Sequence, residues 1–350
     1  MTDSTHPWLQ FLSGQGAELD QDGVVLGFGA TQAVPSDLAS GYIAPLSDLG
    51  LIEARGEDAA HFLHNQLTND IEHLEPGHAR RAGYCSPKGR LLATVLTWKT
   101  QDAIMLQLPR AQQPAIQKRL QMFVLRAKVK LADIGMQQVA LGLGGQPAAQ
   151  TLAAWFPQTP AAPLEKIDSD AGTLIRMPDA FGAPRYLWVA PLELARETWP
   201  QLTQALAPAS TRVWHLADIE AAVPQILPAT QEQFVPQMIN FELVDGVSFK
   251  KGCYPGQEIV ARTQYLGKLK RRMLPAALDG GTIAPGMEVF SSTDPQQPCG
   301  MVVNAAPAPG GGSAALVELK LAALDDGTIH VGSVDGPMLR IQSLPYALPA

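Results

Sequence analysis

The chain is poor in cysteine and in charge. Its 350 residues include three cysteines, Cys85, Cys253 and Cys299, and Asp, Glu, Lys and Arg together make up 17%. An odd, widely spaced set of cysteines argues against a disulfide framework and favours a reducing compartment, so we expect a cytoplasmic protein. Three thiolates are also fewer than the four that a cysteine-only zinc or iron–sulfur site usually takes.

Long apolar runs are missing as well. No stretch reaches the roughly 18 apolar residues that a membrane-spanning helix needs. The opening residues, MTDSTHPWLQFL, have neither the basic region nor the apolar core of a signal peptide. Phosphate-cradling loops, dinucleotide-binding turns, Ser/His/Asp sets and metal-ligand signatures are not found. His61 and His64 are three residues apart on an expected helix without a third ligand nearby, and we interpret them as surface residues.

Positive charge is concentrated in two segments, although the net charge is −7. Residues 76–132 hold eleven Lys and Arg against the single acid Asp102, and residues 250–272, which include Lys268, hold seven against Glu258. Like charges cluster at little cost when they face an anion, so a common anionic ligand is one interpretation. Two solvated basic faces balanced by acidic neighbours are the other.

Apolar periodicity predicts an α+β chain of two or three domains. LGLIEAR is expected as a strand, AAHFLHNQL as a helix, RLLATVLTWK and AIMLQLP as a strand pair, and QPAIQKRLQMFVLRAKVKL as a helix running into a strand. This order predicts a βαββαβ unit over residues 49–131, with Ile116, Leu120, Phe123 and Val124 in its core. From about Lys268 the short strands separated by Gly and Pro predict a small closed β-domain.

The densest chemistry lies in SFKKGCYPGQEIVART. Tyr254-Pro255-Gly256-Gln257 fits a type II turn, after which a helix can begin. Cys253 then lies just before a helix start and two residues after Lys251, and both features stabilise a thiolate. The alternative is that Cys253 is a small buried hydrophobe, the commonest fate of a free cysteine.

A second candidate segment is WHLADIEAAVPQI. Trp214 and Glu220 offer an aromatic ring and a carboxylate, which a flat heterocycle such as a pterin uses for stacking and for hydrogen bonding. The alternative is core packing for Trp214 and a solvated Glu220.

Residues 234–262, FVPQMINFELVDGVSFKKGCYPGQEIVAR, strongly resemble the signature of the YgfZ-type folate-binding proteins, whose hallmark is K-G-C-Y-x-G-Q-E. FLHNQLTNDI, CSPKGRLLATVL, WHLADIEAAVPQI and LPYAL resemble further segments of that family in the same order. The resemblance therefore covers nearly the whole chain from about Leu46. T-proteins of the glycine cleavage system are its wider relatives.

The resemblance implies a three-domain ring around a central hole that binds tetrahydrofolate or a substituted reduced folate, with a C-terminal small β-barrel. Expected domains are 1–50 with 135–265, which bind folate, 51–134, which is ferredoxin-like, and 266–350, the barrel. Cys253 would be the functional thiol. The residues implied to complete the motif are Lys251, Gly252, Tyr254, Gly256, Gln257 and Glu258; those implied to border the folate are Trp214, Glu220, Arg262 and Leu49.

The implied function is support of the assembly or repair of iron–sulfur enzymes, such as those that methylthiolate tRNA, without direct nucleic-acid or membrane binding. Two departures from the family affect the folate site, Ala222 in place of glycine and Leu49 in place of a tryptophan of some members. The alternative function is folate-dependent aminomethyl transfer. T-proteins carry paired aspartates where this chain has Ala93 and Thr94, neither of which is a carboxylate base. A folate-storing module would leave Cys253 unexplained.

Overall fold

The computed structural model describes residues 6–29, 37–265, 269–325 and 327–349. Two compact units emerge from its contacts: Met1–Ala59 with Leu74–Arg80 and Leu96–Ala217, and Ala60–His73 with Arg81–Val95 and Asp218–Ala350. Each is described by itself. The boundaries of the three predicted domains stay a prediction.

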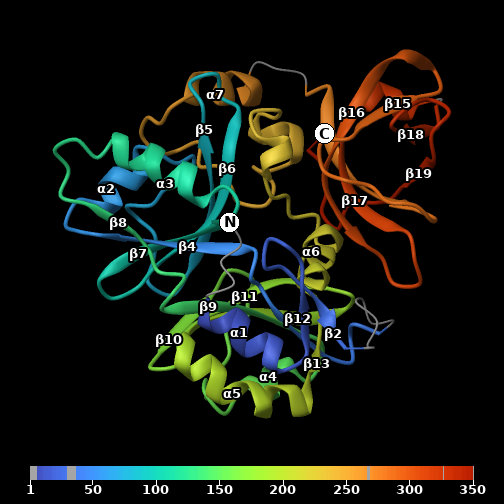
Figure 1. Ribbon diagram of the computed structural model, residues 1–350. Helices are drawn as coiled ribbons and strands as arrows, with labels where there is room; N and C mark the ends of the chain where they lie inside the picture. Colours follow the sequence, from blue (N-terminus) through green and yellow to red (C-terminus); the bar gives the residue numbers. More distant parts are fainter. Residues whose placement is uncertain (1–5, 30–36, 266–268, 326, 350) are drawn as a thin grey trace. The chain divides into compact units, whose positions relative to one another are not determined.

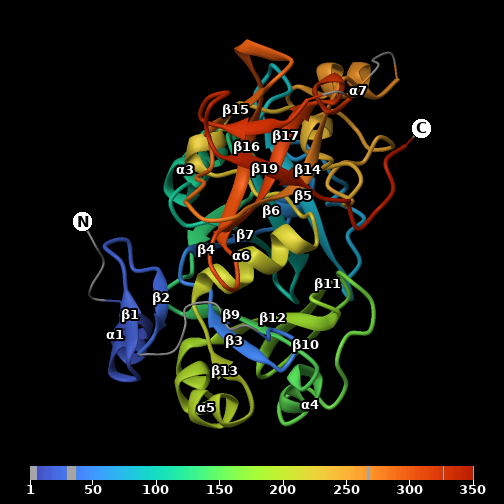
Figure 2. The ribbon, with the colours of Figure 1, turned by 90° about the vertical axis from the view of Figure 1, so that its right-hand side faces the viewer.

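The first unit contains a six-stranded sheet in the order β10-β11-β12-β9-β3-β13. Its strands are antiparallel except for the short β13–β3 pair. Helices α1, α4 and α5 cover one face (Figure 2), where Leu12, Trp188 and Trp199 form the core. The elements are β3 (Tyr42–Pro45), β9 (Gln138–Gly144), β10 (Lys166–Ser169), β11 (Gly172–Ala180), β12 (Ala183–Pro191), β13 (Ala207–Pro208), α1 (Pro7–Gly14), α4 (Ala148–Leu152) and α5 (Leu192–Ala205), with the hairpin β1 (Ala17–Leu19) and β2 (Val25–Phe28) beside α1 and α6 (Thr211–Glu220) following β13.

A second sheet has the order β5-β6-β7-β4-β8. Strand β4 pairs antiparallel with both β7 and β8. Gly50 of β4 lies against Gln113 at the start of α3, because a Cβ there would stand 1.7 Å from the glutamine Oε1. The elements are β4 (Leu49–Arg55), β5 (Ala79–Cys85), β6 (Leu91–Lys99), β7 (Ala103–Pro109), β8 (Lys130–Asp133) and α3 (Gln113–Met122).

The second unit contains helices α2 and α7 and a closed barrel in the order β14-β17-β16-β15-β18-β19, drawn in orange to red in Figure 1. Pairing of β14 with β19 closes it. Its interior is apolar and includes Val317, Leu319 and Cys299. The elements are α2 (Ala59–His64), whose first residue belongs to the first unit, η1 (Pro228–Thr230), η2 (Pro236–Ile239), α7 (Gln257–Tyr265), β14 (Arg271–Leu278), β15 (Glu288–Ser291), β16 (Asp294–Pro307), β17 (Ser313–Lys320), η3 (Leu321–Leu324), β18 (Ile329–Val331) and β19 (Met338–Ile341).

The predicted α+β class and the C-terminal barrel are confirmed, and the barrel begins at Arg271; Lys268 lies outside the described residues, as do residues 1–5. The βαββαβ prediction was incomplete, because the additional strand β5 follows α2. The prediction that Phe123 is a core residue was wrong. Helix α3 ends at Met122, and Phe123 is 47% exposed while Ile116 and Leu120 are buried. None of the helices described here is long and apolar enough to cross a membrane.

Candidate functional site

Cys253 lies on an irregular segment, residues 246–256, which we call the thiol loop. Cys253 and Gly252 are exposed, whereas the next residue, Tyr254, is buried. The loop ends in the predicted turn, in which the Gln257 N–H donates to the Tyr254 carbonyl at 3.2 Å, and α7 begins at Gln257. The interpretation of Cys253 as a buried hydrophobe is therefore wrong, and the thiol is accessible to solvent.

Glycine is required at the third position of this turn. Gly256 has φ +79°, and a Cβ there would stand 2.4 Å from the Ser86 carbonyl oxygen and 2.6 Å from the Gly89 Cα. Gly89, with φ +70°, closes the turn after β5, and a Cβ there would stand 2.8 Å from the Ile259 Cβ of α7. Two glycine turns distant in sequence thus pack backbone to backbone and fix where α7 starts.

The Lys251 side chain crosses to the end of α2. Its ammonium donates to the carbonyls of His64 and Leu67, the latter at 2.8 Å, and lies 4.8 Å from the centre of the Tyr254 ring. Burial lowers the pKa of Lys251 to about 8, while the charges of Asp70, Cys253 and Glu72 act to raise it. The ammonium is therefore largely removed from water and binds backbone carbonyls instead.

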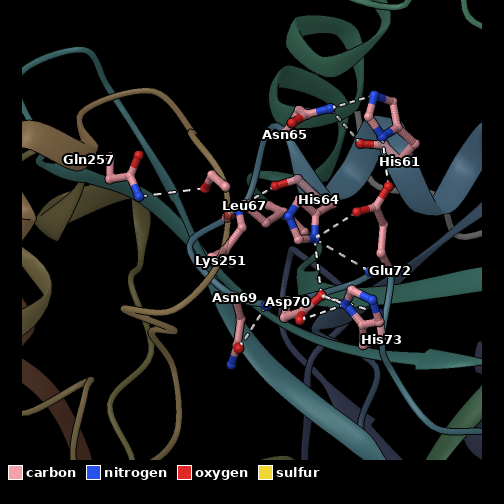
Figure 3. A network of polar contacts seen from close by, with 11 residues as sticks. His61, His64, Asn65, Leu67, Asn69, Asp70, Glu72, His73, Lys251 and Gln257 are labelled. Carbon is pink, nitrogen blue, oxygen red and sulfur yellow. Dashed lines mark hydrogen bonds and ion pairs between the residues drawn. The ribbon is translucent and has the colours of Figure 1, made fainter.

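A polar network surrounds that helix end (Figure 3). His64 Nδ1 lies 3.0 Å from Asp70 Oδ1, and His61 Nδ1 lies 2.6 Å from Glu72 Oε1. The prediction that both histidines are surface residues was half wrong, because His64 is only 6% exposed. Burial acts to raise the pKa of Asp70, but hydrogen bonds from His73 hold it below its usual range. No group of three or more metal-ligating side chains is found in the described part of the chain.

The other two cysteines are shielded. Cys85 is at the end of β5, and burial raises the pKa of its thiol to about 12. Cys299 is in the barrel core, where burial also raises its pKa. Of the three cysteines, Cys253 is therefore the one that a reagent or a partner can reach in the folded protein.

The remaining motif residues lie near the start of α7. Gln257 Nε2 donates to the Gly252 carbonyl at 3.5 Å, a long contact across the loop. Glu258 and Arg262 are both exposed on α7, one turn apart. Their expected roles, in the motif for Glu258 and toward folate for Arg262, stay predictions.

Trp214 and Glu220 are both on α6, and their environments differ. Trp214 is 2% exposed and lies against Gly142, with the buried Arg185 guanidinium 4.7 Å from its ring centre. Glu220, the last residue of α6, is exposed. At about 100° per residue, six positions separate the two side chains by about 120° around the helix. Their shared role toward a heterocycle stays a prediction.

Leu49 borders a pocket of about 560 Å³ in the first unit. Its walls include Trp8, Leu46 and Val139, and the Arg110 guanidinium lies at its edge, donating to the Ser47 carbonyl at 3.1 Å. The indole N–H of Trp8 is buried and has no hydrogen-bond partner among the described residues. Trp214 is not among the residues that border this pocket.

The basic segments are partly used inside the fold. Arg81 donates to the Val244 carbonyl at 3.1 Å, and Arg271 and Arg272 pair with Glu318 and Glu242. Lys250 and Arg262 are exposed near Cys253 in sequence. One anionic ligand for both whole segments is therefore not needed to explain their charge.

Sequence reasoning missed two residues after α2, one that bonds to the thiol loop and one that bonds to the residue just before it. Thr68 Oγ1 donates to the Gly246 carbonyl at 2.6 Å, and Asn69 Nδ2 donates to the carbonyls of Arg81 and Asp245 at 2.8 and 2.6 Å. Their signal was the polar TND triplet directly after an apolar helix, which is typical of a side chain that bonds to backbone. The pocket residues Trp8 and Arg110 had no comparable signal.

No protein-family model matches the chain. The crystal structure of glycine cleavage system aminomethyltransferase T from Bartonella henselae matches it with a TM-score of 0.80 and 17% sequence identity, covering 96% of each chain. A likeness at that identity establishes the fold alone, so the chain has the T-protein fold.

Two curated relatives bear the same name, tRNA-modifying protein YgfZ. The protein of Colwellia psychrerythraea is 30% identical over 240 residues, which are 68% of this chain and 72% of the relative. That of Edwardsiella ictaluri is 31% identical over 230 residues, 65% and 68% of the two chains. The chain therefore belongs to the YgfZ family, as its motif predicted.

Proposed function

We propose that the protein is a folate-binding accessory factor that supports the assembly or repair of iron–sulfur enzymes in the cytoplasm, including enzymes that modify tRNA by methylthiolation. The observation that carries the proposal is the exposed Cys253 on the family motif, in a chain whose other two thiols are buried. Its relatives are named for tRNA modification. A single accessible thiol is suited to act as a transient ligand or nucleophile with a partner's groups.

The pocket beside Leu49 supports the folate part of the proposal. Its volume lies within the range of about 300–1,000 Å³ typical of small-molecule sites. Leucine and valine walls suit an apolar ring, and Arg110 and the unpartnered Trp8 N–H are donors for carbonyl or carboxylate oxygens. A reduced folate has both kinds of group, so these residues fit it; bound there, it would supply one-carbon or reducing chemistry.

Aminomethyl transfer of the T-protein type is the second candidate, and the structure of β6 weighs against it. Ala93 is fully buried, and Thr94 Oγ1 accepts a hydrogen bond of 3.0 Å from the Ile226 N–H. The hydroxyl thus serves the backbone, and neither residue supplies the carboxylate that acid–base help in such a transfer requires.

The role is tested in a bacterium that lacks its own family member. Expression of this protein should restore methylthiolated tRNA and the activity of a [4Fe–4S] enzyme under oxidative stress. If the protein is soluble and abundant but does not rescue the strain, folate storage or aminomethyl transfer becomes the better assignment. An assay of aminomethyl transfer to tetrahydrofolate then distinguishes these two functions.

The folate site is tested by calorimetric titration with tetrahydrofolate. Arg110→Met should weaken binding about tenfold, because a charge-assisted contact is lost. Lys99→Met, which removes a cation at the end of β6 that does not border the pocket, is the matched control. Equal binding by the parent and Arg110→Met would remove the pocket from the proposal.

A further inference from the structure

The thiol loop is fastened at both ends. Where it begins, Thr68 accepts from the Ser248 N–H at 3.0 Å and donates to the Gly246 carbonyl. Where it ends, the buried Tyr254 and the turn at Gly256 fix its exit into α7. The exposed residue Cys253 lies between these two anchors, so its position depends on what holds the middle of the loop.

Lys251 supplies an anchor in the middle. Its ammonium binds the His64 and Leu67 carbonyls, which lie at and just beyond the last residue of α2. The last carbonyls of a helix have no partners within it, and a cation there interacts favourably with the helix dipole. The end of α2 thus offers acceptors to Lys251, which is two residues before Cys253 in the sequence.

The segment that accepts hydrogen bonds from Lys251 is itself held in place. His64 is buried and bonded to Asp70, and Asn69 ties the same segment to the carbonyls of Arg81 and Asp245. Gly252 lies beside this segment, because a Cβ there would stand 3.6 Å from His64 Nε2 (Figure 3 shows His64). Because these acceptors are held in place, the hydrogen bonds from Lys251 fix the position of the middle of the thiol loop.

We propose that Lys251 is a positioning residue, whose ammonium fastens the thiol loop to the carbonyls of His64, at the end of α2, and of Leu67, three residues later, and thereby presents Cys253. The positioning role rests on the proposed function only in that Cys253 is taken to be the functional thiol. The competing role for Lys251 is purely electrostatic, in which its charge favours the Cys253 thiolate and the loop holds its shape without it.

Electron paramagnetic resonance of a nitroxide attached to Cys253 separates the two roles. The other cysteines are buried, so native full-length protein takes the label at Cys253. Lys251→Met keeps the side-chain length and removes the charge and the donors. Lys250→Met makes the same change at the exposed neighbour and is the matched control.

Positioning predicts a mobile spectral component in Lys251→Met, spectra of Lys250→Met that match the parent, and chymotrypsin cleavage after Phe249 that is about tenfold faster in Lys251→Met. An unchanged spectrum and cleavage rate, together with iodoacetamide alkylation of unlabelled Cys253 displaced to higher pH, would overturn the proposal in favour of the electrostatic role.

A folding defect in Lys251→Met does not end the test. Lys251→Arg keeps the cation and should stay closer to the parent than Lys251→Met. If Lys251→Met does not fold, a mobile label in folded Lys251→Arg would contradict the proposal.

Complementation distinguishes this inference from the proposed function. Rescue that fails for the parent protein, with a mobile label in Lys251→Met, leaves the positioning role standing and removes the function. Rescue by the parent with an immobile label in Lys251→Met removes the positioning role alone.

Discussion

Cys253 and Cys299 belong to the same unit and are held in opposite ways. Cys299 is in β16, where paired strands on both sides and an apolar interior enclose it. Cys253 lies on an irregular loop that is held by the Thr68 side chain, which bonds to the Gly246 carbonyl, and by Lys251, which bonds to the backbone carbonyls of His64 and Leu67. Strand ladders bury a thiol, whereas a loop fastened by a few polar contacts can expose one at a defined place.

The largest expected difference between the two regions is thiol reactivity. Cys253 should react with a disulfide reagent in the native protein on the order of 10³ times faster than Cys85 or Cys299, which need local opening to be reached. Stopped-flow titration before and after denaturation measures this. Two or more fast-reacting thiols in the native protein would contradict the burial of Cys85 and Cys299.

The junction between the regions is tested by Arg272→Met. Arg272 and Glu242, each 5% exposed in the side chain, form a buried ion pair just before the thiol loop and in the first barrel strand. Removing one partner should lower the free energy of unfolding by about 3 kcal/mol or more. Arg340→Met, which breaks an exposed pair with Asp279, should cost less than about 1 kcal/mol. Urea denaturation measures both, and equal losses would contradict the assignment.

Two glycines of the motif differ in how closely the surrounding atoms approach them. Gly256→Ala should lower the free energy of unfolding by about 2 kcal/mol, because positive φ and the Ser86 carbonyl both oppose a Cβ. Gly252→Ala meets only ordinary contact at 3.6 Å and should cost well under about 1 kcal/mol. Chemical denaturation of the pair is the check, and a larger loss for Gly252→Ala would count against the described turn.

The smallest expected effect is a pH dependence. The pKa of Lys251 is about 8 in the fold and 10.5 ordinarily, so between these values the unfolded chain binds more protons. Stability from this group therefore rises as pH increases from about 8 to 10.5. The difference in melting temperature between Lys251→Met and the parent should change in favour of the parent across this window. A constant difference would show that the ammonium is not desolvated.

Local patterns predicted local structure well. The type II turn and the start of α7 could be derived because Pro255 and Gly256 impose their own backbone angles. Strands β4, β6 and β7 followed from apolar runs bounded by turns. Phe123 was misplaced because α3 stops one residue before it, and helix ends are set by tertiary contacts that periodicity does not contain.

The site was less predictable. The acceptors of Lys251 are the backbone carbonyls of His64 and Leu67, more than 180 residues earlier in the sequence, and a carbonyl carries no residue-type signal. His64 looked like a surface residue because its burial depends on the loops that follow α2. The family motif predicted which residues matter, whereas the folded chain determines the contacts through which Lys251 acts.

The most direct test of the central claim is rescue of tRNA methylthiolation by Cys253→Ser in a strain lacking its own family member. We expect rescue by the parent and by the matched variant Cys299→Ser, and loss of rescue with Cys253→Ser at equal protein abundance. Full rescue by Cys253→Ser would contradict the assignment of Cys253 as the functional thiol.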